Sequence, residues 1–278
     1  MKIINTYNDI LNLIERMNGV FDLDMWKKYA RFISPFLSEK CTSEIEVYDY
    51  NEQVLPVIQH AIINKTELSK TNDSFIKSVD KLREKVMDGL GVDLDIDIIL
   101  YLGLCNGAGW VTKLGERTVI LLGIEKIIEL NWQSETIMKA LIYHEIGHAW
   151  HEAVGSLYWK TNNPGEHWLM QLYQEGIATF CGQILTGDLE RNQQYDEAWH
   201  TWCHANKKEA FADFLRIVDA GESAQDFFGN WVSYKGHSDV GYFLGNELIK
   251  TAAMDYSLNE LANLDYPVVY GYLQRLGG

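Results

Sequence analysis

A short segment near the middle of the chain combines residues that can bind a metal ion and support hydrolysis. It reads His-Glu-Ile-Gly-His, with His144 and His148 at its ends and Glu145 in second place. Each helical residue turns the chain by about 100°, so in a helix the two histidines face the same side, one turn apart. Two imidazoles placed in this way can bind one metal ion, and Glu145 can reach a water on that ion as a general base.

We expect these residues to lie in a helix over residues 135–154. Ser134 is a suitable cap for its start, and Gly155 is a suitable residue to end it. A lone buried histidine usually bonds to a backbone carbonyl, whereas a pair at this spacing with a glutamate between more often holds a metal. Two stripes of the helix look buried, which places the histidines in a cleft: Ile137, Leu141, His144, His148 and His151 form one, and Met138, Ile142, Ala149 and Ala153 form the other.

The predicted third ligand is Glu175. A catalytic zinc site has three protein ligands and one position left for water or substrate. Glu175 falls on a second expected helix, which starts at Asn163–Pro164 and runs to about residue 185. Its stripe is otherwise apolar or small, and a carboxylate there would be costly to bury without a partner. The alternative is a partly exposed glutamate on that helix. Small side chains at Gly176, Ala178 and Gly182 would allow a close approach to a neighbouring helix.

These two motifs, His-Glu-x-x-His on one helix and Glu-Gly-x-Ala from Glu175 on the next, resemble the gluzincin metallopeptidases. That superfamily includes the thermolysin-like and aminopeptidase-N-like enzymes, and the chain also looks similar to a group of predicted bacterial zinc-dependent proteases. The likeness covers about residues 93–255 and is specific at the two motifs. It implies a zincin-like fold, one Zn²⁺ ion held by His144, His148 and Glu175, and Glu145 as the general base of peptide hydrolysis.

The resemblance also implies a residue that stabilises the tetrahedral oxyanion. In gluzincins a tyrosine or histidine from the C-terminal part donates this hydrogen bond. The Gly-Tyr-x-x-Gly segment containing Tyr242 looks like that element, and His237 just before it is the second candidate. The alternative for Tyr242 is an aromatic ring packed between helices.

Two features near the motifs fit the resemblance less well, and a third disfavours the metzincin family. The separation of His148 and Glu175 is longer than we expect, and an inserted loop at about residues 156–163 would account for it. The metzincin pattern needs glycine at position 151 and histidine at position 154, where this chain has His151 and Val154. His151 lies roughly 10 Å along the helix from His144, too far to share its ion. We expect it to be structural, with a role beside the site or substrate as the alternative.

A second pair of histidines, His200 and His204, also has helical spacing, with Cys203 beside it on a helix expected over residues 195–220. No acidic residue lies between them, and no paired third ligand follows. We therefore expect this face of the helix to be solvated.

The rest of the chain predicts an α+β fold, mostly helical with a small sheet. Residues 1–90 read as an N-terminal helical region, with helices over 7–19, 23–40, 44–64 and 70–88 and a turn-prone junction at 65–74. Residues 91–278 read as the metallopeptidase domain. Strand patterns at 93–102, 110–112 and 117–122 precede the histidine helix, and we expect them to form an antiparallel sheet. Its edge could pair with a peptide, and the alternative is a purely structural sheet.

Composition excludes several classes of protein. The chain has 278 residues and a net charge of −15, a charge that repels phosphate backbones, so we expect no nucleic-acid partner. No run approaches the roughly 18 apolar residues of a membrane span, and the first residues show no apolar signal segment. The four cysteines form no Cys-x-x-Cys pair, which disfavours a cysteine zinc finger or a dense disulfide framework. A cytoplasmic protein that does not contact membranes is expected.

Three functions are compatible with the sequence. The leading hypothesis is a zinc peptidase acting on a peptide or protein substrate. The second is a catalytically silent zinc protein that binds peptides or acts as a scaffold, and the third is a zinc hydrolase of a non-peptide amide. Glu145 favours an enzyme, because a purely structural zinc site does not need it. The binding protein would use a groove lined by Trp150, Trp159, Trp168 and Trp231.

Overall fold

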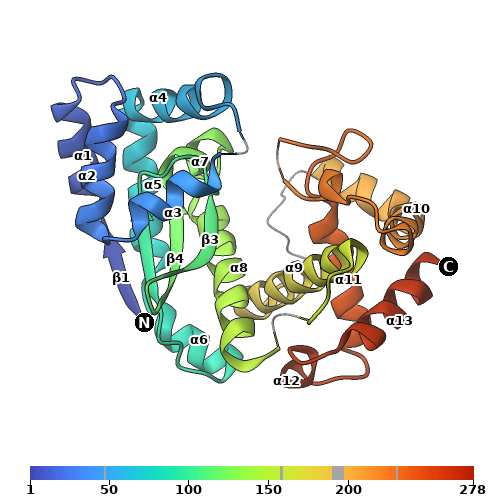
Figure 1. The fold of residues 1–278 in the computed structure, drawn as a ribbon. Helices are drawn as coiled ribbons and strands as arrows, with labels where there is room; N and C mark the ends of the chain where they lie inside the picture. Colours follow the sequence, from blue (N-terminus) through green and yellow to red (C-terminus); the bar gives the residue numbers. More distant parts are fainter. Residues whose placement is uncertain (47, 157–158, 190–196, 230) are drawn as a thin grey trace. The chain divides into compact units, whose positions relative to one another are not determined.

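The computed structural model describes residues 1–46, 48–156, 159–189, 197–229 and 231–278. These residues are mostly helical and include one sheet of four strands, which confirms the α+β class (Figure 1). The chain forms two compact units, Met1–Glu145 and Ile146–Gly278. Their division falls inside one continuous helix, α8 (Glu135–Val154), and differs from the boundary predicted at residue 90.

The sheet is mixed, so the prediction of an antiparallel sheet is wrong for most of it. Its order is β1-β2-β4-β3, with β1 parallel to β2 and β2 parallel to β4. Only β3 and β4 are antiparallel, as their short connection through Gly115 indicates. After β2 the chain forms the edge strand β3, and the next strand, β4, lies between β2 and β3. The bounds are β1 (Lys2–Asn5), β2 (Asp97–Tyr101), β3 (Gly109–Leu114) and β4 (Arg117–Gly123).

Strand β1 lies in the segment predicted to be helical and is paired with β2 from Lys2↔Asp97 to Asn5↔Leu100. The helices that follow are α1 (Tyr7–Arg16), α2 (Leu23–Ile33), α3 (Leu37–Glu44), α4 (Leu55–Ile63), α5 (Lys65–Ser78), α6 (Leu82–Leu90) and α7 (Ile124–Glu129), with a π-helical turn at Tyr50–Val54 before α4.

Two of the predicted N-terminal helices are broken by backbone geometry. The helix expected over 23–40 stops at Ser34, which is extended because it precedes Pro35. The helix expected over 70–88 is divided at Lys81, which has a φ of 52° in the left-handed region. The turn-prone junction expected at 65–74 is wrong, since these residues are the first part of α5.

The second unit is built around α9 (Pro164–Thr186), which lies beside α11 (Val240–Ala252) (Figure 1). The two backbones touch, because a Cβ placed on Gly176 would lie 2.3 Å from the carbonyl oxygen of Gly245. Apolar side chains such as Ile177 and Leu244 are fully buried there. The other helices are α10 (Glu197–Ala220), α12 (Leu258–Leu261) and α13 (Tyr266–Gly277), with a 3₁₀ turn at Gln225–Phe227.

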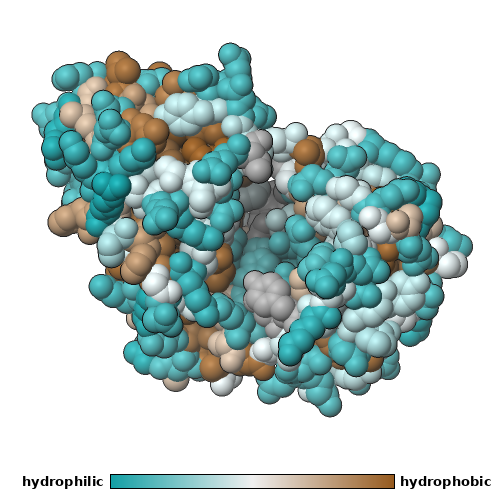
Figure 2. Space-filling model, in the orientation of Figure 1, coloured by the Kyte–Doolittle hydropathy of each residue, from teal (hydrophilic) through white to brown (hydrophobic). Residues whose placement is uncertain are grey.

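Figure 2 shows one face on which hydrophilic residues predominate, with apolar residues scattered among them. None of the described helices combines the length and the apolar content that crossing a bilayer requires.

Candidate metal centre

Two helices carry the candidate ligands, and both form where local sequence signals predicted them. Helix α8 has the expected bounds, Glu135–Val154. Helix α9 begins at Pro164, and the Asn163 side chain accepts a hydrogen bond of 2.9 Å from the Gly165 amide at its start. Gly187 ends α9 in the left-handed conformation, which glycine adopts without strain.

Small residues bring α8 and α9 into backbone contact next to the motifs. A Cβ built on Gly147 would lie 2.6 Å from both the Cα and the carbonyl oxygen of Ala178. Gly147 immediately precedes His148, and Ala178 is three residues after Glu175. The close approach expected from the small side chains of α9 therefore occurs at the positions where it brings Glu175 to His148.

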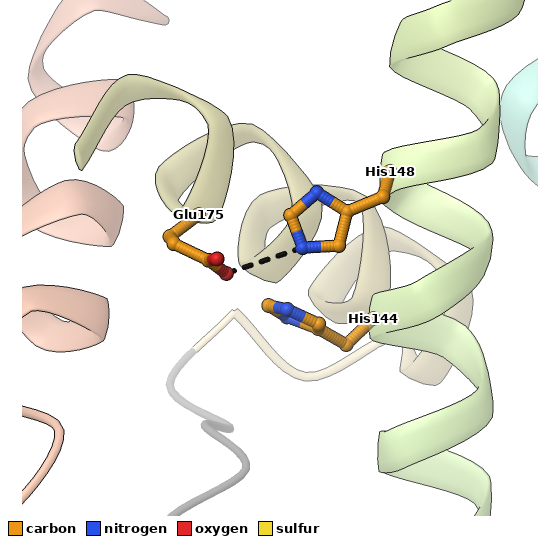
Figure 3. A group of neighbouring side chains, drawn as sticks. All are labelled: His144, His148 and Glu175. Carbon is orange, nitrogen blue, oxygen red and sulfur yellow. Dashed lines mark hydrogen bonds and ion pairs between the residues drawn. The ribbon is translucent and has the colours of Figure 1, made fainter. Parts of the chain in front are cut away.

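The structure brings the three predicted ligands together. One ligand atom from each of His144, His148 and Glu175 lies within 4.8 Å of the other two. Figure 3 shows the two imidazoles extending from α8 and the Glu175 carboxylate reaching toward them from α9. The His148 Nε2 and the Glu175 Oε2 are 3.1 Å apart. Among the described residues, this is the one such group of histidine, cysteine, aspartate or glutamate side chains.

The group has the composition of a metal site, and one pair of its ligand atoms has the expected spacing. Two ligands that are each about 2.0–2.1 Å from a tetrahedral ion lie roughly 3.3 Å from one another, close to the distance between His148 and Glu175. His144 is buried, while His148 and Glu175 are partly exposed, with 20% and 14% of their side chains accessible. The three residues can therefore hold a divalent cation with solvent within reach.

Glu145 follows the first ligand and is buried with 5% exposure. Its carboxylate lies against Gly109, the first residue of β3. The absence of a side chain at Gly109 leaves room for this carboxylate.

Tyr242 and His237 lie in the same unit as Glu175 but outside the ligand group. Tyr242 is in the first turn of α11, and the edge of its ring meets Phe228 at 6.2 Å between centroids. His237 stacks on Trp202, with ring centroids 3.9 Å apart. Their role at an oxyanion stays a prediction.

His151 has the contacts of a packed residue. It is fully buried, its Nε2 lies 3.1 Å from the Ala262 carbonyl oxygen, and its ring meets the edge of Tyr173. Burial, together with the nearby charge of His148, lowers the pKa of His151 to about 4, against the opposing effect of the Ala262 carbonyl. His151 is therefore neutral at physiological pH, as the structural interpretation requires.

The second histidine pair does not form a ligand group among the described residues. The ring of His204 packs edge-on against Phe243, and the ring of His200 packs edge-on against Trp199. His204 is exposed, in agreement with the expected solvated face.

Comparison with known proteins gives no assignment. No family model, no curated protein and no solved structure matches this chain. The interpretation of the site therefore rests on its residues and their geometry.

Proposed function

We propose that this chain is a zinc-dependent peptidase of the gluzincin type. The observation that carries the proposal is the convergence of His144, His148 and Glu175 within 4.8 Å, with Glu145 next to the first of them. Two imidazoles and one carboxylate are the protein ligands of known catalytic zinc sites, which keep a fourth position for water or substrate.

In this proposal His144, His148 and Glu175 hold one Zn²⁺ ion. When bound, zinc supplies charge that lowers the pKa of a water toward about 7 and polarises a carbonyl. Glu145 takes the proton of the attacking water and passes it to the leaving amine. Tyr242 or His237 donates a hydrogen bond to the oxyanion.

The sheet supports a peptide as the substrate. Strand β3 is an edge strand of the sheet, and its first residue, Gly109, lies against Glu145. An extended peptide can add to such an edge through main-chain hydrogen bonds. A peptide paired with β3 would thus be held beside the proposed base, which favours a peptide over a small non-peptide amide.

The cysteines support a reducing, cytoplasmic setting for the enzyme. Cys41, Cys105, Cys181 and Cys203 are all free and buried. Proteins of oxidising compartments more often use their cysteines in disulfides.

The test combines metal analysis with digestion of a broad peptide library. The wild-type protein should contain one zinc per chain and cleave peptides. The Glu145→Gln variant should keep its zinc and lose activity by about 10²–10⁴-fold, the usual contribution of a general base. Unimpaired cleavage by this variant would remove Glu145 from that role. Zinc without cleavage by the wild type would favour the scaffold, and cleavage of simple amides alone would favour the non-peptide hydrolase.

A further inference from the structure

We infer that Gly109 is a positioning residue for Glu145, and that the missing side chain at position 109 sets where the carboxylate lies. The inference rests on the proposed function, in which Glu145 is the general base. Gly109 lies in the sheet and is not itself one of the proposed metal ligands.

The contact between the two residues is close. A Cβ built on Gly109 would lie 2.7 Å from both Cγ and Oε1 of Glu145, and 2.9 Å from its Cδ. Real Cβ atoms essentially never make non-bonded contacts with other heavy atoms at less than 3.0 Å. Any larger residue at this position would therefore exclude the observed placement of the Glu145 side chain.

The backbone conformation does not require glycine here. Gly109 is an ordinary strand residue in register with Leu122 of β4, and it is not among the residues with positive φ. Alanine could adopt the same backbone angles. The space next to Glu145 is what a side chain at position 109 would remove.

Residues 102–108 connect β2 to β3 and lead to Gly109. Side chains from two helices form hydrogen bonds with the start of this loop. Trp26 of α2 donates a hydrogen bond to the Leu102 carbonyl at 2.8 Å, and the Tyr29 hydroxyl accepts one from the Leu102 amide at 3.0 Å. The fully buried Glu125 accepts hydrogen bonds from the amides of Gly103 and Cys105 at 2.7 and 3.0 Å.

The end of the loop between β2 and β3 forms a hydrogen bond with strand β4. The Gly123 amide of β4 donates to the Ala108 carbonyl at 3.0 Å. A new methyl group at position 109 would thus meet a fixed strand on one side and a rotatable side chain on the other. The Glu145 carboxylate would move, and the strand would stay in place.

Such a movement affects proton transfer more than metal binding. A displacement of about 1 Å in a reacting group can cost roughly 10²-fold in rate. The candidate metal ligands lie on α8 and α9, and the three atoms nearest to a Cβ at position 109 all belong to Glu145. We therefore expect Gly109→Ala to lower kcat by about 10–100-fold with KM changed less than about 3-fold, because the loss falls on the transition state.

The experiment compares Gly109→Ala with Gly271→Ala, a glycine-to-alanine change at a position where a Cβ meets nothing within 4 Å. For each protein we would measure bound zinc, Tm, kcat, KM and the pH–rate profile. The carboxyl ¹³C resonance of Glu145, assigned with Glu145→Gln, is followed by NMR during a pH titration. This last measurement does not depend on activity.

The expected result in Gly109→Ala is a displaced Glu145 resonance, a shifted acid limb of the pH–rate profile and a lower kcat. Its zinc content and Tm should be close to those of the wild type. If the wild type cleaves peptides and Gly109→Ala matches it in both kcat and Glu145 resonance, the inference is wrong while the peptidase stands. If the wild type cleaves nothing, the NMR comparison still decides whether Gly109 positions Glu145, and only the proposed activity fails.

Discussion

Gly147 of α8 and Ala178 of α9 touch through their backbones, with a built Cβ of Gly147 only 2.6 Å from the Ala178 Cα. The contact lies one residue from His148 and three residues from Glu175. Because backbone atoms cannot move aside as a side-chain end can, this pair fixes how closely the two helices that carry the candidate ligands approach. The short separation of α8 and α9 therefore requires glycine at position 147.

Gly147→Ala should separate the two helices and weaken both stability and metal binding. We expect a loss of about 1–3 kcal/mol in the free energy of unfolding, the usual cost of forcing extra volume into a packed contact. Urea unfolding of the metal-free protein measures this loss, and a zinc titration measures the fall in affinity. Gly271→Ala, which meets open space inside helix α13, should leave zinc affinity unchanged and should raise stability by up to about 1 kcal/mol, the gain in helix propensity. Wild-type stability and zinc affinity in Gly147→Ala would contradict the packing argument.

Loss of one ligand should abolish tight zinc binding. We expect His148→Ala to lower zinc affinity by more than about 100-fold, since even partners one step beyond the ligands contribute roughly 10–100-fold. His204→Ala is a matched control, because His204 is an exposed histidine that shares helical spacing with His200. Competition with a chromogenic chelator gives both affinities. Equal affinities in the two variants would show that the ion, if bound, is held elsewhere.

The buried carboxyl of Glu125 should make stability fall as pH rises. Burial raises its pKa from 4.5 to about 7, although the amides of Gly103 and Cys105 oppose the change. The folded state therefore holds the proton more tightly than the unfolded state. The resulting stabilisation is complete below pH 4.5 and is lost as pH rises to about 7, a change of about 3 kcal/mol.

Urea unfolding at pH 5 and pH 8 tests this linkage. The difference in unfolding free energy between the two pH values should shrink by up to about 3 kcal/mol in Glu125→Gln, because glutamine does not titrate. Glu84→Gln, at an exposed position of α6, controls for the loss of one carboxylate from an acidic chain. An unchanged pH dependence in Glu125→Gln would show that Glu125 is charged in the folded protein.

The helices that carry the candidate ligands could be predicted because their signals are local. Asn163 and Pro164 mark the start of α9, Gly187 marks its end, and the spacing of His144 and His148 is meaningful only in a helix. Glu175 could be predicted as the third ligand from one physical argument, the cost of burying an unpaired carboxylate at that position. Each of these inferences needs only neighbours within a few turns of the chain.

The arrangement of the sheet could not be predicted in the same way. Strand β1 has four residues without a buried face, and its partner β2 begins at Asp97, far along the chain. The insertion of β4 between β2 and β3 depends on pairing between distant segments, which periodicity does not reveal. The contact of Gly109 with Glu145 was missed for the same reason, since it joins a strand to a helix across the fold.

Strand β1 covers the hydrogen-bonding edge of strand β2. Along β2, the consecutive residues Ile98, Ile99 and Leu100 are all buried, and β1 occupies the hydrogen-bonding edge of that strand. An apolar strand with an open row of amides and carbonyls invites pairing with other chains. Deleting the first five residues would uncover such a row, so self-association into aggregates is the consequence to expect of that truncation.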